Sequence, residues 1–170
     1  MLHLPIYLDN NATTPMDPRV LESMLPFFTK HFGNAASHSH TFGWEAEAAV
    51  QYAREQVANL INSEPNEIVF TSGATESDNL ALKGVFEMYA SKGNHIITVS
   101  TEHKAVLDSC AYLEKLGADV NYLGVNNEGI IGLKELESTI KPEPILIAVM
   151  YANNETGVIQ LVKEIEQIAK

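Results

Sequence analysis

The 170-residue sequence has one cysteine, no long apolar run and few basic residues. Cys110 has no second cysteine to pair with, so no internal disulfide is expected, which fits a reducing compartment. No run of about 18 apolar residues occurs, so no transmembrane helix is expected. Residues 1–9 have neither the basic n-region nor the small-residue cleavage site of a signal peptide. We therefore expect a cytoplasmic protein.

Positive charge is also scarce. Lys and Arg total 11 against 22 Asp and Glu, which gives a formal net charge of −11. Nucleic acids and anionic lipids are bound by basic faces, so we expect neither a nucleic-acid nor a membrane partner. The length and the 45% hydrophobic content are typical of one soluble globular domain, and no repeat or low-complexity tract is visible.

Short apolar runs alternate with amphipathic stretches along the chain. Asp17 and Pro18 together predict a capped helix start, and residues 32–43 are expected to form an ordered loop. The predicted helices are 18–29, 44–61, 75–90, 103–116, 133–140 and 162–170, and the predicted strands or extended pieces are 5–8, 67–71, 95–100, 119–125 and 145–151. The fully apolar run 145–151 is typical of the centre of a parallel sheet. The alternation predicts an α/β domain with a mainly parallel sheet.

The segment Thr71–Ser77 lies between a predicted strand and a predicted helix. Gly73 lets a ligand approach the backbone, and the amides of Ala74 and Thr75 would be free at the helix N-terminus, where the helix dipole favours an anion. The alternative is an ordinary turn with Ser72 or Thr75 as the N-cap. The segment lacks the Gly-Lys-Ser/Thr of a P-loop.

Two further polar segments follow predicted strands. His103 would stack on a planar cofactor or transfer protons, and the alternative is a water-exposed histidine at a helix start. Asn153 and Asn154 would donate to a cofactor oxygen while Glu155 orients a neighbour, and the alternative is plain turn chemistry. Because ligands bind at the carboxyl ends of parallel strands, we expect the three segments to form one site.

Two other candidates are expected to be non-catalytic. The histidines near residues 31–40 have no Cys pair or acidic residue at zinc spacing, so no metal site is expected. Cys110 lies among apolar residues of a predicted helix and is expected to be a buried small hydrophobe rather than a nucleophile.

Five segments carry a family resemblance: YLDNNATTP (7–15), FGNAASHSHTFG (32–43), IVFTSGATESDNLALKG (68–84), TEHKAV (101–106) and ANNETGVIQ (152–160). In this order they resemble the NifS/IscS-like cysteine desulfurases, in the class V aminotransferase group of pyridoxal 5′-phosphate (PLP) enzymes. The resemblance implies a three-layer α/β fold, part of the large domain of a fold-type I PLP-dependent transferase. It also implies that 1–15 is an N-terminal segment associated with the active site and small domain, and that 16–170 is the N-terminal part of the PLP-binding large domain.

The resemblance further implies a reaction and its residues. L-cysteine would become L-alanine, with persulfide sulfur passed to an acceptor or iron–sulfur scaffold protein, by a homodimer when full length. Ala74 and Thr75 match positions that hold the PLP phosphate, and His103 matches the histidine that stacks on the ring and acts as acid and base. Asn154 matches the residue that bonds the phenolic oxygen, and Asn34 and Asn154 lie on the substrate side.

The sequence also departs from the family pattern. Ala35 and Leu161 stand where the family usually has proline. The Ser-x-His-Lys motif of the Schiff-base lysine is absent, and none of the nine lysines (11 Lys and Arg less Arg19 and Arg54) lies in that context. The persulfide cysteine and the substrate-carboxylate arginine of the family have no counterpart either. We therefore expect an N-terminal portion that is inactive alone and prone to self-association.

Two alternatives remain from the sequence. One is a selenocysteine lyase or another class V enzyme on the same scaffold. The other is a non-catalytic binding or assembly fragment.

Overall fold

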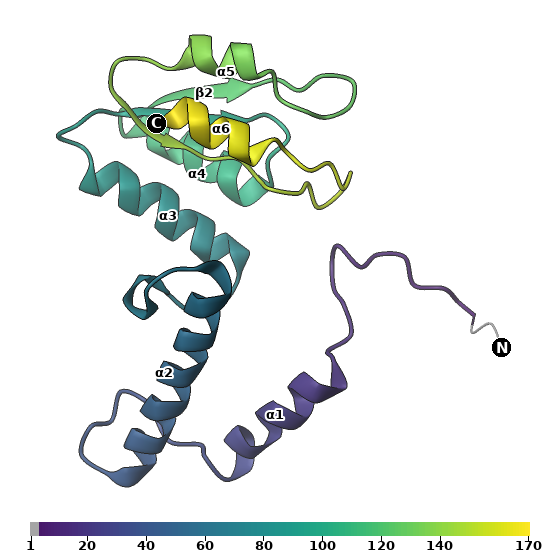
Figure 1. Ribbon diagram of the computed structural model, residues 1–170, viewed down its shortest axis with the longest axis vertical. Coiled ribbons are helices and arrows are strands. Elements are labelled where there is room, and N and C mark those ends of the chain that lie inside the picture. The colour runs from purple at the N-terminus through teal and green to yellow at the C-terminus, as the bar shows by residue number, and fades with distance from the viewer. Residues whose placement is uncertain (1–3) are drawn as a thin grey trace. The chain divides into compact units, whose positions relative to one another are not determined.

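The computed structural model describes residues 4–170 and divides into two compact units, Met1–Phe70 and Thr71–Lys170 (Figure 1). Residues 1–3 of the predicted N-terminal segment lie outside the described residues, and residues 6–9 have no regular secondary structure. None of the helices in the described range is both long and apolar enough to span a membrane.

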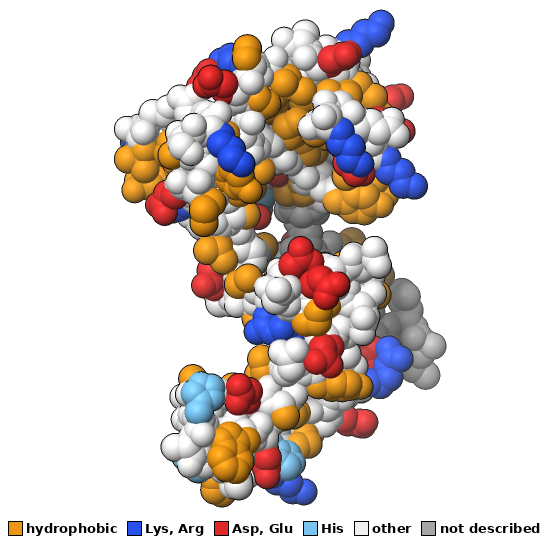
Figure 2. Space-filling view, turned by 60° about the vertical axis from the view of Figure 1, so that its left-hand side comes forward, with side chains coloured by type: hydrophobic (Ala, Val, Ile, Leu, Met, Phe, Trp, Pro, Cys, Tyr) orange, Lys and Arg blue, Asp and Glu red, His pale blue; other side chains and the backbone are white. Residues whose placement is uncertain are grey.

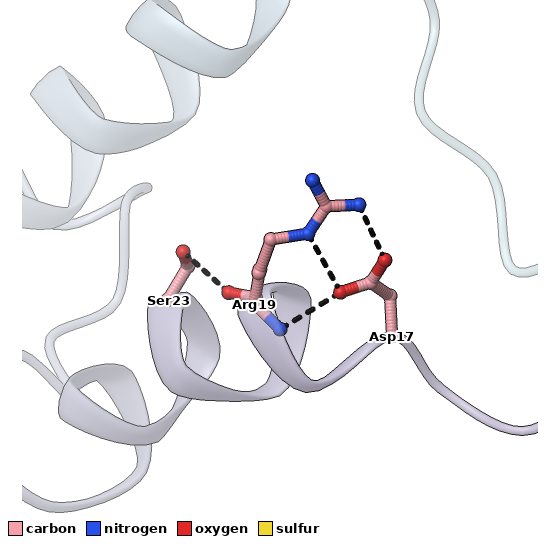
Figure 3. Close-up of polar contacts among 3 residues, drawn as sticks. All are labelled: Asp17, Arg19 and Ser23. Carbon is pink, nitrogen blue, oxygen red and sulfur yellow. Dashed lines mark hydrogen bonds and ion pairs between the residues drawn. The ribbon is translucent and has the colours of Figure 1, made fainter.

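The first unit opens with helix α1, Pro18–Thr29, as predicted. Asp17 caps it, because its carboxylate accepts the Arg19 amide at 2.9 Å and the Arg19 guanidinium at 2.6 Å (Figure 3). Ser23 donates its hydroxyl to the Arg19 carbonyl at 2.9 Å. Pro26 lies inside the helix without ending it, and the helix runs on to Thr29.

Helix α2, Thr41–Ile61, begins three residues before the predicted start at Trp44. The cap is His40, whose Nδ1 accepts the Gly43 amide at 3.2 Å. Histidine is not among the usual capping residues, so the start predicted from the sequence is too late. The helix ends at Asn62 in the left-handed conformation, with φ of 57°.

The predicted strand 67–71 is wrong. A short 3-10 helix, η1, covers Pro65–Glu67, and residues 68–71 pair with no strand within the described chain. A strand needs a neighbouring edge as well as β-branched residues. Here the Ile68 carbonyl accepts from the Arg54 guanidinium, which also lies 5.0 Å from the Phe70 ring centroid.

The first unit buries little apolar surface. No residue of α1 is buried in the described structure, and α2 buries Ala46 and Ala58 but leaves Leu60 85% exposed. Hydrophobic side chains accordingly reach its surface (Figure 2). The exposed aromatic ones include Phe28, Phe32, Phe42, Trp44 and Tyr52.

The second unit alternates helices and strands. Its elements are α3 (Ala74–Met88), β1 (His95–Val99), α4 (Lys104–Lys115), β2 (Asp119–Leu123), α5 (Leu133–Thr139), β3 (Pro144–Ile147) and α6 (Val162–Ala169). The strands form a parallel sheet in the order β2-β1-β3. β1 aligns with β2 from His95–Asp119 to Val99–Leu123, and with β3 at Ile96–Leu146 and Ile97–Ile147.

The centre of this sheet is β1, and the prediction that 145–151 is central is wrong. Every residue of β1 is buried, whereas β3 is half-buried and ends at Ile147. The backbone continues alongside β1 for one more bond, from the Ala148 amide to the Ile97 carbonyl at 2.8 Å. An apolar run signals burial but does not say which strand has two neighbours.

Two apolar cores cover the two faces of the sheet. The first packs α3 and α4 against it and contains Leu82, Ile96, Val106, Cys110, Leu113 and Ala118. The second packs α5 and α6 against the opposite face and contains Ile97, Val99, Leu123, Ile131, Leu136 and Ile165. The predicted three-layer α/β fold with a parallel sheet is therefore confirmed.

Candidate functional site

The candidate site occupies the end of the second unit where β1 and β3 finish. The carboxyl ends of parallel strands lie at one edge of a sheet, so residues 100–103 and 148–154 are neighbours there. The first turns of α3 lie beside them, because Asp78, Glu102 and Met150 line one cleft of about 340 Å³. Within this unit the second and third predicted segments are in contact, since Asn153 bonds Thr101, and α3 borders the same cleft from Asp78 onward.

The N-terminus of α3 leaves backbone donors free. Its N-cap is Gly73, which makes no side-chain capping bond, and the amides of Ala74 and Thr75 donate to no acceptor within residues 4–170. The alternative, an ordinary turn capped by Ser72 or Thr75, does not occur, since both the Ser72 amide and its hydroxyl donate to Glu76 at 2.6 and 2.7 Å. Those two bonds lower the pKa of the Glu76 carboxyl.

The glycine at the start of α3 has open space beside it. Gly73 has an extended backbone, with φ 160° and ψ 179°, so no tight left-handed turn requires glycine here. A Cβ built on it would meet no atom within 4 Å in the described structure. The start of α3 is therefore open beside Gly73, and free amides at a helix N-terminus favour an anion.

His103 is the N-cap of α4. Its Nδ1 accepts the Ala105 amide at 3.1 Å, while the ring remains exposed and Nε2 has no partner in the described chain. This bond requires Nδ1 to be unprotonated, so a neutral ring carries its proton on Nε2. The structure therefore holds the ring at one nitrogen and leaves its face and the other nitrogen available.

The two neighbouring asparagines differ in their contacts. The Asn153 side chain is fully engaged: its Nδ2 donates to the Thr101 carbonyl at 3.0 Å, and its Oδ1 accepts the amides of Glu155 and Thr156 at 3.0 and 2.9 Å. Asn154 is exposed, and its side chain bonds nothing within the described chain. Of the two donors expected from the sequence, Asn154 alone is available to a ligand.

Glu102 was not singled out from the sequence. Only 9% of it is exposed, and its Oε1 accepts the Met150 amide at 2.5 Å. Burial raises the pKa of its carboxyl, the Met150 bond opposes this, and the charge of Asp78 adds to the rise. The sequence offered one indication of this role, because Glu102 lies shortly after a buried strand and next to the candidate His103.

Gln160 braces the loop that carries Asn154, and it too was missed. It is buried; its Oε1 accepts the Ile131 amide at 3.1 Å and its Nε2 donates to the Gly129 carbonyl at 2.8 Å. The backbone amide of Gln160 donates to the Tyr151 carbonyl at 3.0 Å, and this bond joins the two ends of the loop. Nothing in the sequence pairs Gln160 with residues about thirty positions earlier, so only the fold reveals this role.

Asn34 lies in the first unit. Its Oδ1 accepts the Ala36 amide at 2.9 Å, and its carbonyl accepts the Ser37 amide at 2.9 Å. These bonds shape the turn in the 32–40 loop. Its role on the substrate side stays a prediction.

The three histidines in the described part of the first unit have local partners. His31 lies 3.4 Å from Glu45, His38 lies 3.5 Å from Glu47, and His40 caps α2. Within residues 4–170, no group of three His, Cys, Asp or Glu side chains gathers as a metal site would require.

Cys110, on the core-facing side of α4, is buried as predicted, with a relative exposure of 0%. Desolvation raises the pKa of its thiol to about 11, and the charges of Glu114 and Glu102 add to the rise. A thiol that stays protonated and shielded is a poor nucleophile.

This donor set fits the cofactor that the resemblance implies. The free amides at the dipole-positive end of α3 suit a phosphate, and the open space beside Gly73 leaves room for it. The exposed ring of His103 offers an aromatic face, and the free Asn154 amide offers a donor to an anionic oxygen.

Known proteins resemble this chain along nearly its whole length. The cysteine desulfurase IscS of Neisseria meningitidis serogroup C / serotype 2a is 58% identical over 166 residues, covering 98% of this chain and 41% of that protein. A solved NifS-like protein superposes with a TM-score of 0.92 at 44% identity, covering 97% of this chain and 45% of that one. SspA, solved in complex with cysteine, superposes with a TM-score of 0.90 at 40% identity, covering 96% and 47%.

The curated relatives are longer than this chain, which spans about 41% of their length. Residues 6–170 match the family described as aminotransferase class V. The match includes all three segments that meet at the edge of the sheet. The chain therefore belongs to the aminotransferase class V family.

Proposed function

We propose that this chain supplies the phosphate- and ring-binding part of a PLP-dependent cysteine desulfurase. The whole enzyme would convert L-cysteine to L-alanine and pass persulfide sulfur to an acceptor or iron–sulfur scaffold protein. The similarity to proteins named cysteine desulfurase supports the reaction, and the relative solved with cysteine supports the substrate.

One observation carries this proposal: three unused groups lie around one edge of the sheet. They are the amides of Ala74 and Thr75, the exposed ring of His103 and the free side chain of Asn154. All four residues are exposed, so a ligand can reach these groups from solvent. A ligand with a phosphate, a planar ring and an anionic ring oxygen would use all three.

Each residue has a defined task in this proposal. Ala74 and Thr75 bind the phosphate through backbone N–H groups, His103 stacks on the ring and holds or releases a proton at Nε2, and Asn154 donates to the phenolic oxygen. Asn34 and Asn154 contact the substrate. The bound cofactor supplies the electron sink for bond cleavage at the substrate.

The chain alone is expected to bind the cofactor without completing the reaction. Its sequence contains no Ser-x-His-Lys motif to supply the Schiff-base lysine. We also propose that residues 1–15 contribute to the active-site side of the molecule, that 16–170 belong to the large domain, and that the full-length enzyme is a cytoplasmic homodimer.

Binding of pyridoxine 5′-phosphate tests the site. This analogue has no aldehyde, so it does not react with surface lysines. We expect nuclear magnetic resonance shifts at the amides of Ala74 and Thr75, the ring of His103 and the side chain of Asn154. Asn154→Ala should weaken binding about tenfold, the loss of one hydrogen bond to a charged oxygen. Asn127→Ala, at an exposed position, is the control.

Two results would count against the proposal. Shifts confined to other regions, or no binding at millimolar analogue, would remove the cofactor site. A borohydride-reducible PLP adduct on this chain, absorbing near about 420 nm, would contradict the expected lack of a Schiff-base lysine.

The reaction is tested on the holoenzyme with L-cysteine. Equal release of alanine and of reducible sulfur supports a desulfurase, and transamination without sulfur release contradicts it. Activity restricted to selenocysteine would favour the lyase alternative. A stable chain that binds no cofactor would favour the assembly alternative.

A further inference from the structure

Two side-chain bonds cross between the loop that carries His103 and the loop that carries Asn154. In one direction, Glu102 of the first loop accepts the Met150 amide of the second at 2.5 Å. In the other direction, Asn153 of the second loop donates its Nδ2 to the Thr101 carbonyl of the first at 3.0 Å. Each loop thus holds the backbone of the other.

Glu102 occupies a place that a backbone carbonyl would otherwise fill. β1 ends at Val99, whose carbonyl accepts the Glu102 amide at 3.2 Å, and β3 ends at Ile147. The Ala148 amide still finds a carbonyl on β1, that of Ile97 at 2.8 Å, and the Thr98 hydroxyl donates to the Ala148 carbonyl at 3.0 Å. Two residues on, the Met150 amide meets the Glu102 carboxylate instead.

Burying a charged carboxylate at this position costs desolvation free energy, so a bond that served only the local structure would be made more easily by a neutral group. Glu102 is buried, and desolvation raises the pKa of its carboxyl despite the Met150 bond. Asp78, on α3, adds a second negative charge to the same cleft. Buried carboxylates are uncommon unless they are bonded, and a bond to a charged group is stronger than a neutral one.

Asn153 is suited to the reverse bond because it does two things at once. Its Oδ1 shapes the turn by accepting from Glu155 and Thr156, and its Nδ2 remains free to reach Thr101. An aspartate would shape the same turn but has no donor for Thr101. The carboxamide is therefore required for the crossing bond and not for the turn.

We propose that Glu102 and Asn153 are positioning residues that set the separation between His103 and Asn154. Each lies next to one of those two residues in the chain and bonds the loop of the other. The pair, called the loop bridge below, acts on the ring end of the cofactor, since neither bond involves the amides of Ala74 and Thr75. This inference rests on the proposed cofactor site.

The experiment compares two ligands that share a phosphate. Pyridoxine 5′-phosphate uses the ring contacts, and inorganic phosphate uses only the α3 amides. We expect Glu102→Ala to weaken pyridoxine 5′-phosphate about tenfold, as for one lost positioning bond, and to change phosphate affinity less than about twofold. Removal of a negative charge would by itself strengthen anion binding, so the expected loss opposes the electrostatic effect.

Two further variants separate positioning from folding. Glu102→Gln keeps an oxygen for the Met150 amide and should restore most of the affinity, and slow hydrogen exchange of that amide should return with it. Asn153→Asp keeps the turn and should weaken the ring-bearing ligand while His103 and Asn154 signals shift. The matched controls are Glu87→Ala, on α3, and Asn127→Asp, both exposed and without side-chain partners in the described chain.

The outcomes distinguish the loop bridge from the site it serves. If the unaltered chain binds phosphate and pyridoxine 5′-phosphate equally, the proposed cofactor site is wrong and the positioning role falls with it. If it prefers the ring-bearing ligand and Glu102→Ala and Asn153→Asp keep that preference, the site stands and the loop bridge is overturned. Equal weakening of both ligands would indicate general loss of structure and would also overturn it.

Discussion

Asn153 and Asn154 are identical residues at adjacent positions with different tasks. The first is held by its turn and by Thr101, while the second is exposed and unbonded within the described residues. The same side chain can therefore serve as a structural cap or as a ligand donor, and its surroundings decide which. A substitution at Asn153 should act through loop position, whereas one at Asn154 should act on a ligand directly.

Cys110 should react slowly with thiol reagents while the chain is folded. Burial raises the pKa of this thiol to about 11, so at pH 8 almost none is thiolate, and the core excludes the reagent. We expect labelling by 5,5′-dithiobis(2-nitrobenzoate) at least about a hundredfold slower in the native chain than in guanidinium chloride. Equal rates would show that the helix α4 region is open in solution.

Glu102 should give the chain a distinct pH dependence of stability. Its pKa in the folded state is raised by burial from an ordinary 4.5, so the folded state binds this proton more tightly than the unfolded state. The stabilising effect is complete below the unfolded pKa and is lost as pH rises through the folded pKa. Glu102→Gln does not titrate and should therefore gain stability relative to the unaltered chain as the pH rises above the ordinary pKa of 4.5.

Urea unfolding at several pH values measures this effect. Glu87→Gln, on the exposed side of α3, is the control and should leave the profile unchanged. Parallel profiles for the unaltered chain and Glu102→Gln would show that Glu102 is solvated in the folded state.

At the scale of elements, the loop 151–160 is a short hairpin-like turn held from two sides. Asn153 ties it to the end of β1, and Gln160 ties it to residues 129–131. Gly157 turns the chain between them with φ of 74°, and its amide donates to the Asn153 carbonyl at 2.8 Å. The exposed Asn154 thus lies on a loop with fixed ends.

Gly157→Ala should destabilise this loop by about 1–2 kcal/mol, because an L-residue with a Cβ resists the left-handed conformation. Gly84→Ala in α3 provides a control of opposite sign. It should stabilise the chain by about 0.5–1 kcal/mol, since that helical glycine has nothing within 4 Å of the added Cβ. Urea unfolding of both variants measures the two effects, and a neutral Gly157→Ala would contradict the turn described here.

Helices were predicted well where their caps were conventional. Asp17 and Pro18 correctly predicted the start of α1. The start predicted for α2 was three residues too late, because its cap is His40. Strands were predicted by apolar content, which located β1 but also suggested a strand at 67–71 and a central place for 145–151. Pairing partners and strand order depend on contacts between distant residues, which composition does not encode.

The candidate site was predicted as a set of loops but not as a connected structure. Strand–loop order was enough to bring His103 and Asn154 to one edge. The tasks of Glu102, Asn153 and Gln160 depend on bonds to residues far along the chain, so a local pattern could not reveal them.

At the scale of the whole molecule, the two units differ in how much apolar surface they bury. The second unit has two cores, one on each face of its sheet. The first has an unburied α1 within the described residues and leaves Phe28 and Phe32 68% and 67% exposed. Large exposed apolar areas usually mark surfaces that another protein surface covers.

The chain by itself should therefore self-associate. Sedimentation velocity over a range of about 5–200 µM should show a sedimentation coefficient that rises with concentration. Phe28→Ser together with Phe32→Ser should reduce this dependence, while Glu87→Gln should not. A single monomeric species with cooperative unfolding at all concentrations would contradict the expectation.

The loop bridge also sets a time at which the site can form during synthesis. Its two bonds join residues 48 and 52 positions apart, so a nascent chain that has completed β1, α4 and β2 still lacks one side of the bridge. Contacts of such long sequence separation slow folding, because loop closure costs entropy before the contacts are made. His103 therefore emerges well before the residues that fix its position, and a cofactor would find its ring pocket only after about fifty further residues have left the ribosome.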